Sequence, residues 1–202
     1  KFNGWAQRVP YIKHDLMFCL DVGHRGTVGD IWGMPNEMRR FEDPLLAWLS
    51  FDYGIYAENW GAATKAAALS ELGWNNILRP VKDLVDSDGN FGKGIVRRSL
   101  INGGREYVSE DTIMSNAALK EGLQCQFTHK IRILQSVEKT QFEAVSFIGR
   151  FGAAVIEMVL GVPYQEFIHS RKTHWTKKIG SLFSADFYIN KRWIIATNVA
   201  MF

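Results

Sequence analysis

The sequence predicts one α/β domain in which a mixed sheet is flanked by helices. The 202 residues are 47% hydrophobic and 22% charged, which supplies enough apolar side chains for one sizeable core. Two apolar runs, residues 16–20 and residues 45–51, have the length of buried strands. A capped stretch with one apolar face, residues 109–122, has the signals of a helix. Strands that alternate with helices indicate the α/β class.

The first apolar run, residues 16–20, ends in the polar turn Asp21-Val22-Gly23-His24. A continuous apolar run bounded in this way is typical of a strand buried on both faces of a parallel sheet. Asp21 would then lie at the carboxyl end of the strand, where ligands bind in open α/β sheets. Asp21 also fits an ordinary turn residue after a strand, and His24 fits a surface position, so both interpretations stay open here.

Proline and alanine mark the next elements. Pro35 suits the first turn of a helix over residues 35–41, and Pro44 would stop that helix. Residues 45–51 are the second strand candidate. The alanine-rich residues 60–72 favour another helix, because alanine has the highest helix propensity.

A glycine-rich turn follows these elements. The spelling Asp-Ser-Asp-Gly-Asn at residues 86–90 begins like a calcium loop, but the later ligands of such a loop are missing. A turn is the simpler interpretation. The turn continues through Gly92 and Gly94, and a short apolar stretch then leads into Arg97.

Ser109 opens the next helix and Gly122 closes it. Ser109 is a good N-cap, and the acids Glu110 and Asp111 suit the positive end of the helix dipole. Their role as capping acids is therefore one interpretation that stays open. Short strand candidates follow at residues 124–127 and 130–134.

The order of these features carries a resemblance to a known family. A Gly-x-Gly turn, a strand into Arg-Arg-Ser, a Gly-Gly pair, and then Glu-Asp on a helix ending in glycine resemble the acceptor and catalytic segment of processive glycosyltransferases with the GT-A fold. These are family-two enzymes such as cellulose, chitin and hyaluronan synthases. The Ser-Glu-Asp form and Lys120-Glu121-Gly122 also resemble the 1,3-β-glucan synthases.

The resemblance implies a partial GT-A-like mixed sheet. It also implies that Asp111 is the general base that takes a proton from the acceptor hydroxyl, with Glu110 in support. Substrate contacts are implied for Gly92, Gly94 and Arg97.

A divalent cation, Mg²⁺ or Mn²⁺, is implied on the diphosphate of the sugar donor. The family places an Asp-x-Asp motif, often followed by histidine, at the end of the strand that Asp21 would close. Asp21 and His24 match this pattern and are the implied metal ligands, whereas Gly23 stands in place of the second acid. The Asp-x-Asp spelling at residues 86–88 is an alternative source of ligands.

Residues 140–160 occupy the place of a family helix that carries Gln-x-x-Arg-Trp. Arg150 is retained in the matched register, while Phe151 stands for tryptophan and Phe147 for glutamine. The resemblance implies that Arg150 holds the diphosphate by charge-assisted hydrogen bonds and that Phe151 faces the acceptor sugar. An amphipathic core helix with one solvent-exposed arginine is the alternative interpretation.

Composition and the C-terminal residues bear on partners and location. A net charge of +3 indicates no nucleic-acid partner, and the widely spaced Cys19 and Cys125 are expected to be reduced and buried. Basic and aromatic residues flank the apolar stretches after residue 160, which suits amphipathic, interfacial helices leading toward a membrane. A soluble amphipathic helix fits as well. These flanking residues are Arg171, Lys172, Lys177, Lys178, Lys191, Arg192 and Trp193.

We therefore expect a catalytic GT-A-like half over residues 1–140 and interfacial helices over residues 141–202. The expected activity is that of a membrane-associated inverting glycosyltransferase, a hexosyltransferase that extends a β-glucan, with UDP-glucose as donor and a polysaccharide acceptor. Its catalytic side would face the cytoplasm, within a larger complex, and the chain would be a piece of a longer polypeptide. The alternatives are a non-catalytic GT-A-like binding or structural subunit and an α/β protein of unrelated function.

Overall fold

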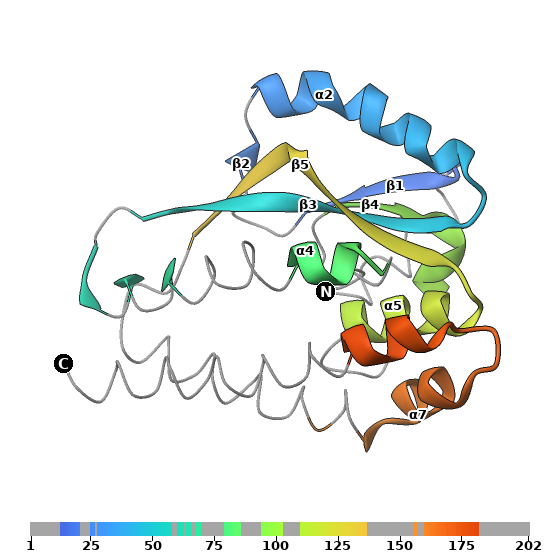
Figure 1. The fold of residues 1–202 in the computed structure, drawn as a ribbon. Coiled ribbons are helices and arrows are strands. Elements are labelled where there is room, and N and C mark those ends of the chain that lie inside the picture. The colour runs from blue at the N-terminus through green and yellow to red at the C-terminus, as the bar shows by residue number, and fades with distance from the viewer. Residues whose placement is uncertain are drawn as a thin grey trace.

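A five-stranded mixed sheet with helices on both faces forms the centre of the molecule (Figure 1). The α/β class, with a mixed sheet and flanking helices, is therefore confirmed. The structure, a computed structural model, describes residues 13–20, 25–26, 28–57, 60–62, 64–65, 68–69, 79–85, 94–102, 110–136, 156 and 160–181.

The strand order is β1-β4-β3-β5-β2. The long strands β3 (Leu46–Tyr56) and β5 (Gln124–Ser136) form a parallel pair at the centre. β4 (Gly94–Arg97) lies antiparallel on the other side of β3. Short antiparallel strands complete the two edges: β1 (Leu16–Cys19) pairs with β4, and β2 (Arg25–Gly26) pairs with β5.

Two irregularities bend the central pair. Leu46 pairs with Gln124 and Trp48 with Cys125, so β3 carries one extra residue at this point. Further along, Phe51 pairs with Thr128 but the next residue of β3 pairs with Arg132, so β5 carries three extra residues there. The two short strands predicted at residues 124–127 and 130–134 are therefore one strand, β5, with this irregularity between them.

The sheet separates two hydrophobic cores. One lies against α2 (Val28–Met38) and the other against α5 (Glu110–Lys120) and α7 (Val162–His169), as the layers in Figure 1 show. The first contains Phe41, Leu46, Leu49, Phe51, Ile95, Ile131 and Ile133. The second contains Cys19, Ala47, Trp48, Val96, Met114, Ala118, Leu119, Cys125, Tyr164 and Phe167. Both cysteines are free and buried, as predicted.

The helix predicted from Ser109 to Gly122 is confirmed as α5. Gly122 adopts a φ of 84°, which a glycine tolerates without strain. Its N–H donates to the Leu119 carbonyl at 3.0 Å, and the N–H of Leu123 donates to the Ala118 carbonyl at 3.1 Å. This pair of bonds is the Schellman motif that ends many helices.

The prediction of a parallel, doubly buried strand at residues 16–20 is wrong in its pairing. β1 is an edge strand, antiparallel to β4, and Phe18 is 44% exposed. The apolar run arises because its alternate side chains reach both cores, with Cys19 in the α5 core and Leu16 and Leu20 against the α2 core. Coverage of both faces does not require parallel neighbours.

The elements around Pro35 and Pro44 agree in part with the sequence. α2 begins at Val28 and contains Pro35, so the helix starts earlier than the proline predicts. A 3₁₀ turn, Arg39–Glu42, ends it, and the next residue is extended before Pro44 as expected. The described residues from 62 to 69 are helical, whereas residues 86–88 and the expected boundary at residue 140 lie outside the described residues.

Candidate functional site

The two predicted catalytic acids occupy the first turn of α5. Glu110 and Asp111 are the first residues of this helix, which passes through the turn at Gly122 directly into β5. The helix therefore runs antiparallel to β5 beneath the sheet. Its first turn points toward the carboxyl ends of the parallel strands β3 and β5, where α/β sheets bind ligands.

Ala118 of α5 lies in one hydrophobic cluster with Trp48 of β3 and Cys125 of β5, so the C-terminal half of the helix packs near the beginning of both strands. From Ala118 back to Glu110 the helix rises about 12 Å, away from this contact.

The helix is enclosed by protein along most of its length. From Ile113 to Leu119 every residue except Ala117 is buried, including the polar Ser115 and Asn116. A helix buried on nearly all sides is held by packing rather than by its own propensity. The first turn of α5 therefore continues from a helix that is held in place by its packing.

The segment after α7 anchors the other end of α5. The Thr173 hydroxyl donates to the Leu119 carbonyl at 2.6 Å, and the Ser170 hydroxyl donates to the Lys120 carbonyl at 2.7 Å. The Lys177 ammonium donates to the carbonyl of Leu123 at 3.0 Å. These donors satisfy carbonyls at the helix end, where a positive charge is favoured by the helix dipole.

The basic residues near this anchor have protein partners. Lys172 pairs with Glu121 at 2.5 Å, and the Lys178 ammonium donates to the Ser170 carbonyl at 2.8 Å. With Lys177 on Leu123, three of the basic residues that flank the apolar stretches after residue 160 therefore contact other described residues. In the described part of the chain, no helix has the length and apolar character that a membrane crossing requires.

Gly94 and Arg97, two predicted substrate contacts, have clear places in the fold. A Cβ on Gly94 would lie 2.2 Å from the Leu49 carbonyl oxygen, so only glycine allows β3 and β4 to approach this closely. Arg97 donates to the carbonyls of Leu46, Phe41 and Asp43 at 2.7, 2.8 and 2.9 Å. These contacts tie β4 to the corner before β3, and a substrate role for either residue stays a prediction.

The remaining predicted site residues, Gly92, Arg150, Phe151, Asp21 and His24, lie outside the described residues. Within the described ranges, no three His, Cys, Asp or Glu side chains gather closely enough to hold a metal ion. The metal site therefore stays a prediction, and no chemical step below passes through it.

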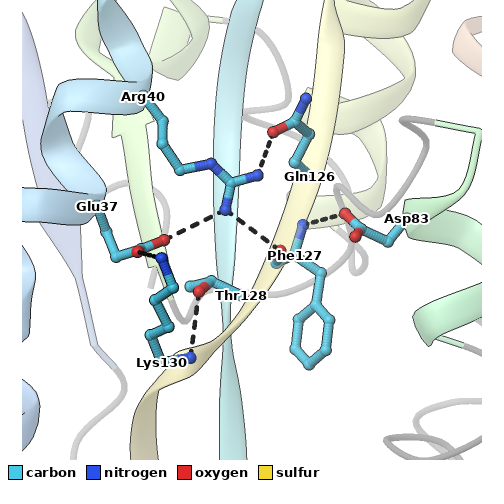
Figure 2. Close-up of polar contacts among 7 residues, drawn as sticks. All are labelled: Glu37, Arg40, Asp83, Gln126, Phe127, Thr128 and Lys130. Atoms are coloured by element: carbon cyan, nitrogen blue, oxygen red, sulfur yellow. Dashed lines mark hydrogen bonds and ion pairs between the residues drawn. The ribbon is translucent and has the colours of Figure 1, made fainter.

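A charged network that the sequence did not predict lies between α2 and β5 (Figure 2). Glu37 is 1% exposed, and it pairs with Arg40 and with Lys130, each at 3.2 Å. Arg40 also donates to the side chain of Gln126. Burial acts to raise the pKa of Glu37, but hydrogen bonds from Thr128, Arg40 and Lys130 outweigh burial and hold that pKa below its usual value.

The outer edge of β5 is covered by side chains at Phe127. Figure 2 shows its main-chain N–H donating to the Asp83 carboxylate at 2.6 Å, while Arg40 approaches its carbonyl at 3.5 Å. Asp83 closes α4 (Arg79–Asp83), and Arg79 lies 4.0 Å from the centre of the Phe127 ring. Side chains that occupy main-chain groups in this way protect a strand edge from pairing with other chains.

A second buried carboxylate, Asp52, lies on β3 opposite the irregularity in β5. Its Oδ2 atom accepts hydrogen bonds from Nε and NH2 of Arg132, at 2.9 and 2.8 Å. Nδ1 of His129 lies 3.9 Å from the same oxygen. Asp52 is 4% exposed, whereas the side chains of Arg132 and His129 are each 62% exposed. In the sequence, Asp52 directly follows the strand predicted at residues 45–51, which the structure extends to Tyr56.

Comparison with known proteins does not assign the chain to a family. No protein-family model and no curated protein matches the sequence. The glycosyltransferase resemblance therefore depends on the motifs of the chain itself.

Proposed function

We propose that this chain is the acceptor-side, catalytic half of a membrane-associated, inverting glycosyltransferase with a GT-A-like fold. It extends a β-glucan from a nucleotide sugar, with UDP-glucose as the expected donor, on the cytoplasmic side of a membrane and within a larger complex. The observation that carries the proposal is the place of Asp111, in the first turn of a buried helix that points toward the carboxyl ends of β3 and β5.

In the proposed reaction, Asp111 accepts the proton of an acceptor hydroxyl as that oxygen attacks the anomeric carbon of the donor sugar. The bond from this carbon to the diphosphate breaks on the opposite side, so the configuration inverts. The positive end of α5 favours the carboxylate form that a base requires. Glu110 supports the base, Arg150 holds the departing diphosphate and Phe151 faces the acceptor.

The test is the variant Asp111→Asn, which keeps the size of the side chain and removes the base. Sugar incorporation from UDP-glucose should fall by about 10²–10⁴ while the thermal unfolding curve stays unchanged. Asp15→Asn is the matched control, because the side chain of Asp15 is 87% exposed and lies far from α5 in sequence. Equal incorporation by Asp111→Asn and the parent would remove Asp111 from the mechanism.

A non-catalytic GT-A-like subunit is the second candidate. The observation that favours it is the use of Gly94 and Arg97 inside the fold, since their contacts need no substrate to explain them. Such a subunit would bind glucan or nucleotide sugar without releasing UDP. Measurable UDP release that depends on Asp111 would exclude it.

A further inference from the structure

The C-terminal end of α5 is held by a segment that lies far from it in the sequence. Residues 170–177, here called the α5 clamp, place hydrogen-bond donors on this end. The Thr173 hydroxyl donates to the Leu119 carbonyl at 2.6 Å, and the Ser170 hydroxyl donates to the Lys120 carbonyl at 2.7 Å. The last carbonyls of a helix have no partner within the helix. Here two of them have side-chain donors from the clamp, so the end of α5 is tied to that segment.

The turn that ends α5 also fits closely against the clamp. The Lys177 ammonium donates to the Leu123 carbonyl at 3.0 Å, on the far side of the turn. A Cβ on Gly122 would lie 3.3 Å from the carbonyl oxygen of Lys172. The main chain of the clamp therefore lies directly against the turn, where glycine leaves room for it.

The clamp is itself held in place by the helix that precedes it. Phe167 of α7 is fully buried and Tyr164 is 6% exposed, and both pack in the same core as Met114 of α5. The Lys172 N–H donates to the Ser170 hydroxyl oxygen at 3.2 Å. This bond leaves the hydroxyl proton of Ser170 to α5, so the donor that reaches the helix end is oriented before it gets there.

These contacts differ in kind from the packing along α5. Apolar contacts such as those of Met114 and Ala118 are non-directional, so they hold the helix against the sheet. A hydrogen bond instead needs its two atoms within a narrow range of distance and angle. The clamp therefore limits movement of α5 along its own axis. Asp111 lies eight residues before Leu119, about 12 Å along this axis, and a continuous helix carries a shift of one end to the other.

We propose that Ser170 and Thr173 are positioning residues, which fix α5 along its axis and thereby set the place of Asp111. The role of Asp111 as the base rests on the proposed function, whereas the clamp rests on its own contacts. A general base must lie within hydrogen-bond reach of the proton that it takes. A displacement of about 1 Å can lower turnover by about 10²-fold. Both hydroxyls act through α5.

The double variant Ser170→Ala, Thr173→Val tests the proposal in the full chain. The kcat for sugar incorporation should fall by about tenfold or more, while the KM for UDP-glucose stays within about twofold of the parent value, because the base acts in the transition state. Thr173→Ser keeps both hydroxyls and should retain the parent kcat. Thr176→Val is the matched control, because its hydroxyl contacts the His174 ring instead of α5.

A loss of stability alone must not produce the same result. Glu37→Gln removes a buried charge on the other face of the sheet, so it weakens the fold without touching the clamp. Its kcat should equal that of the parent. A double variant with the parent kcat would overturn the proposal. An equal fall of kcat in the double variant and in Glu37→Gln would overturn it as well, since stability would then explain both.

The proposed function and the clamp fail in different ways. If the parent incorporates no sugar, the transferase is removed and hydrogen exchange decides on the clamp. The amides of residues 114–117 donate to the carbonyls of the first turn of α5, so their exchange reports on that turn. Faster exchange there in the double variant would keep the clamp, and exchange equal to that of the parent would remove it. Turnover that depends on Asp111 but not on the clamp hydroxyls would keep the transferase alone.

Discussion

Among the described residues, each face of the sheet has one buried carboxylate, and the two carboxylates differ in their hydrogen-bond partners. On the α2 face, Glu37 has both oxygens engaged, one by Arg40 and one by Lys130 (Figure 2). On the α5 face, Asp52 has one oxygen engaged by Arg132. A fully satisfied buried polar group helps to hold a fold in one arrangement.

Under the proposed function, the two faces have different roles. α2 and β5 are joined by Glu37 and its partners, so substitutions there should change stability. The first turn of α5, which contains the proposed base Asp111, lies on the other face, so substitutions there should change turnover. The predictions below test that division.

The largest loss of stability is expected at Gly94, where β4 approaches β3 closely in the middle of the sheet. In Gly94→Ala, the added Cβ would lie 2.2 Å from the Leu49 carbonyl oxygen, and neither main chain can move without breaking the β3–β4 pairing. We expect a loss of more than about 3 kcal/mol in the free energy of unfolding. Gly61→Ala is the control, because a Cβ there meets nothing within 4 Å. A Gly94→Ala protein as stable as the parent would contradict the described approach of the strands.

A smaller loss is expected from Glu37→Gln on the α2 face. The amide keeps the shape of the side chain but loses the charge that Arg40 and Lys130 neutralise. At neutral pH we expect a loss of about 2 kcal/mol in the free energy of unfolding, measured by urea denaturation. Sugar incorporation should not change, which distinguishes this face from the face that contains Asp111.

The pH dependence of the same variant checks the cause. The pKa of Glu37 is lowered in the fold from its ordinary value of 4.5. A lowered pKa contributes stability above that value, and the contribution is lost as pH falls through the folded-state pKa. The gap between parent and Glu37→Gln should therefore be full near pH 7 and close below about pH 4.5. Glu42→Gln, at an exposed position, is the control for removing one negative charge from this part of the chain.

The sequence predicted the elements whose signals are local. Ser109, two acids and Gly122 predicted the helix at residues 110–120, and the structure places it as expected. The stop before Pro44 depends on the geometry of proline alone and is also confirmed. Pairing partners are not local, which is why the direction of β1 was predicted wrongly.

Sequence patterns could not predict the polar clusters either, because their members are far apart in the chain. Glu37 meets Lys130, and Asp52 meets Arg132, only after distant segments pair. The three extra residues of β5 bring His129 and Arg132 to Asp52, and no composition or spacing predicts that irregularity. The predicted strand ended at residue 51, so the sequence did not show that Asp52 would be buried inside β3, where its charge must be compensated.

The smallest effect is expected at the anchor of α5. Thr173→Val removes a buried hydroxyl that donates to the Leu119 carbonyl at 2.6 Å and keeps the shape of the side chain. The same carbonyl still accepts from the N–H of Gly122, so the loss in the free energy of unfolding should be only about 1 kcal/mol. Thr176→Val is the control, because its hydroxyl contacts the exposed His174 ring at 2.8 Å rather than α5. Amide hydrogen exchange along α5 should quicken in Thr173→Val and stay unchanged in Thr176→Val. Equal exchange in the two variants would mean that core packing alone holds the helix, and that the segment after α7 has no part in placing Asp111.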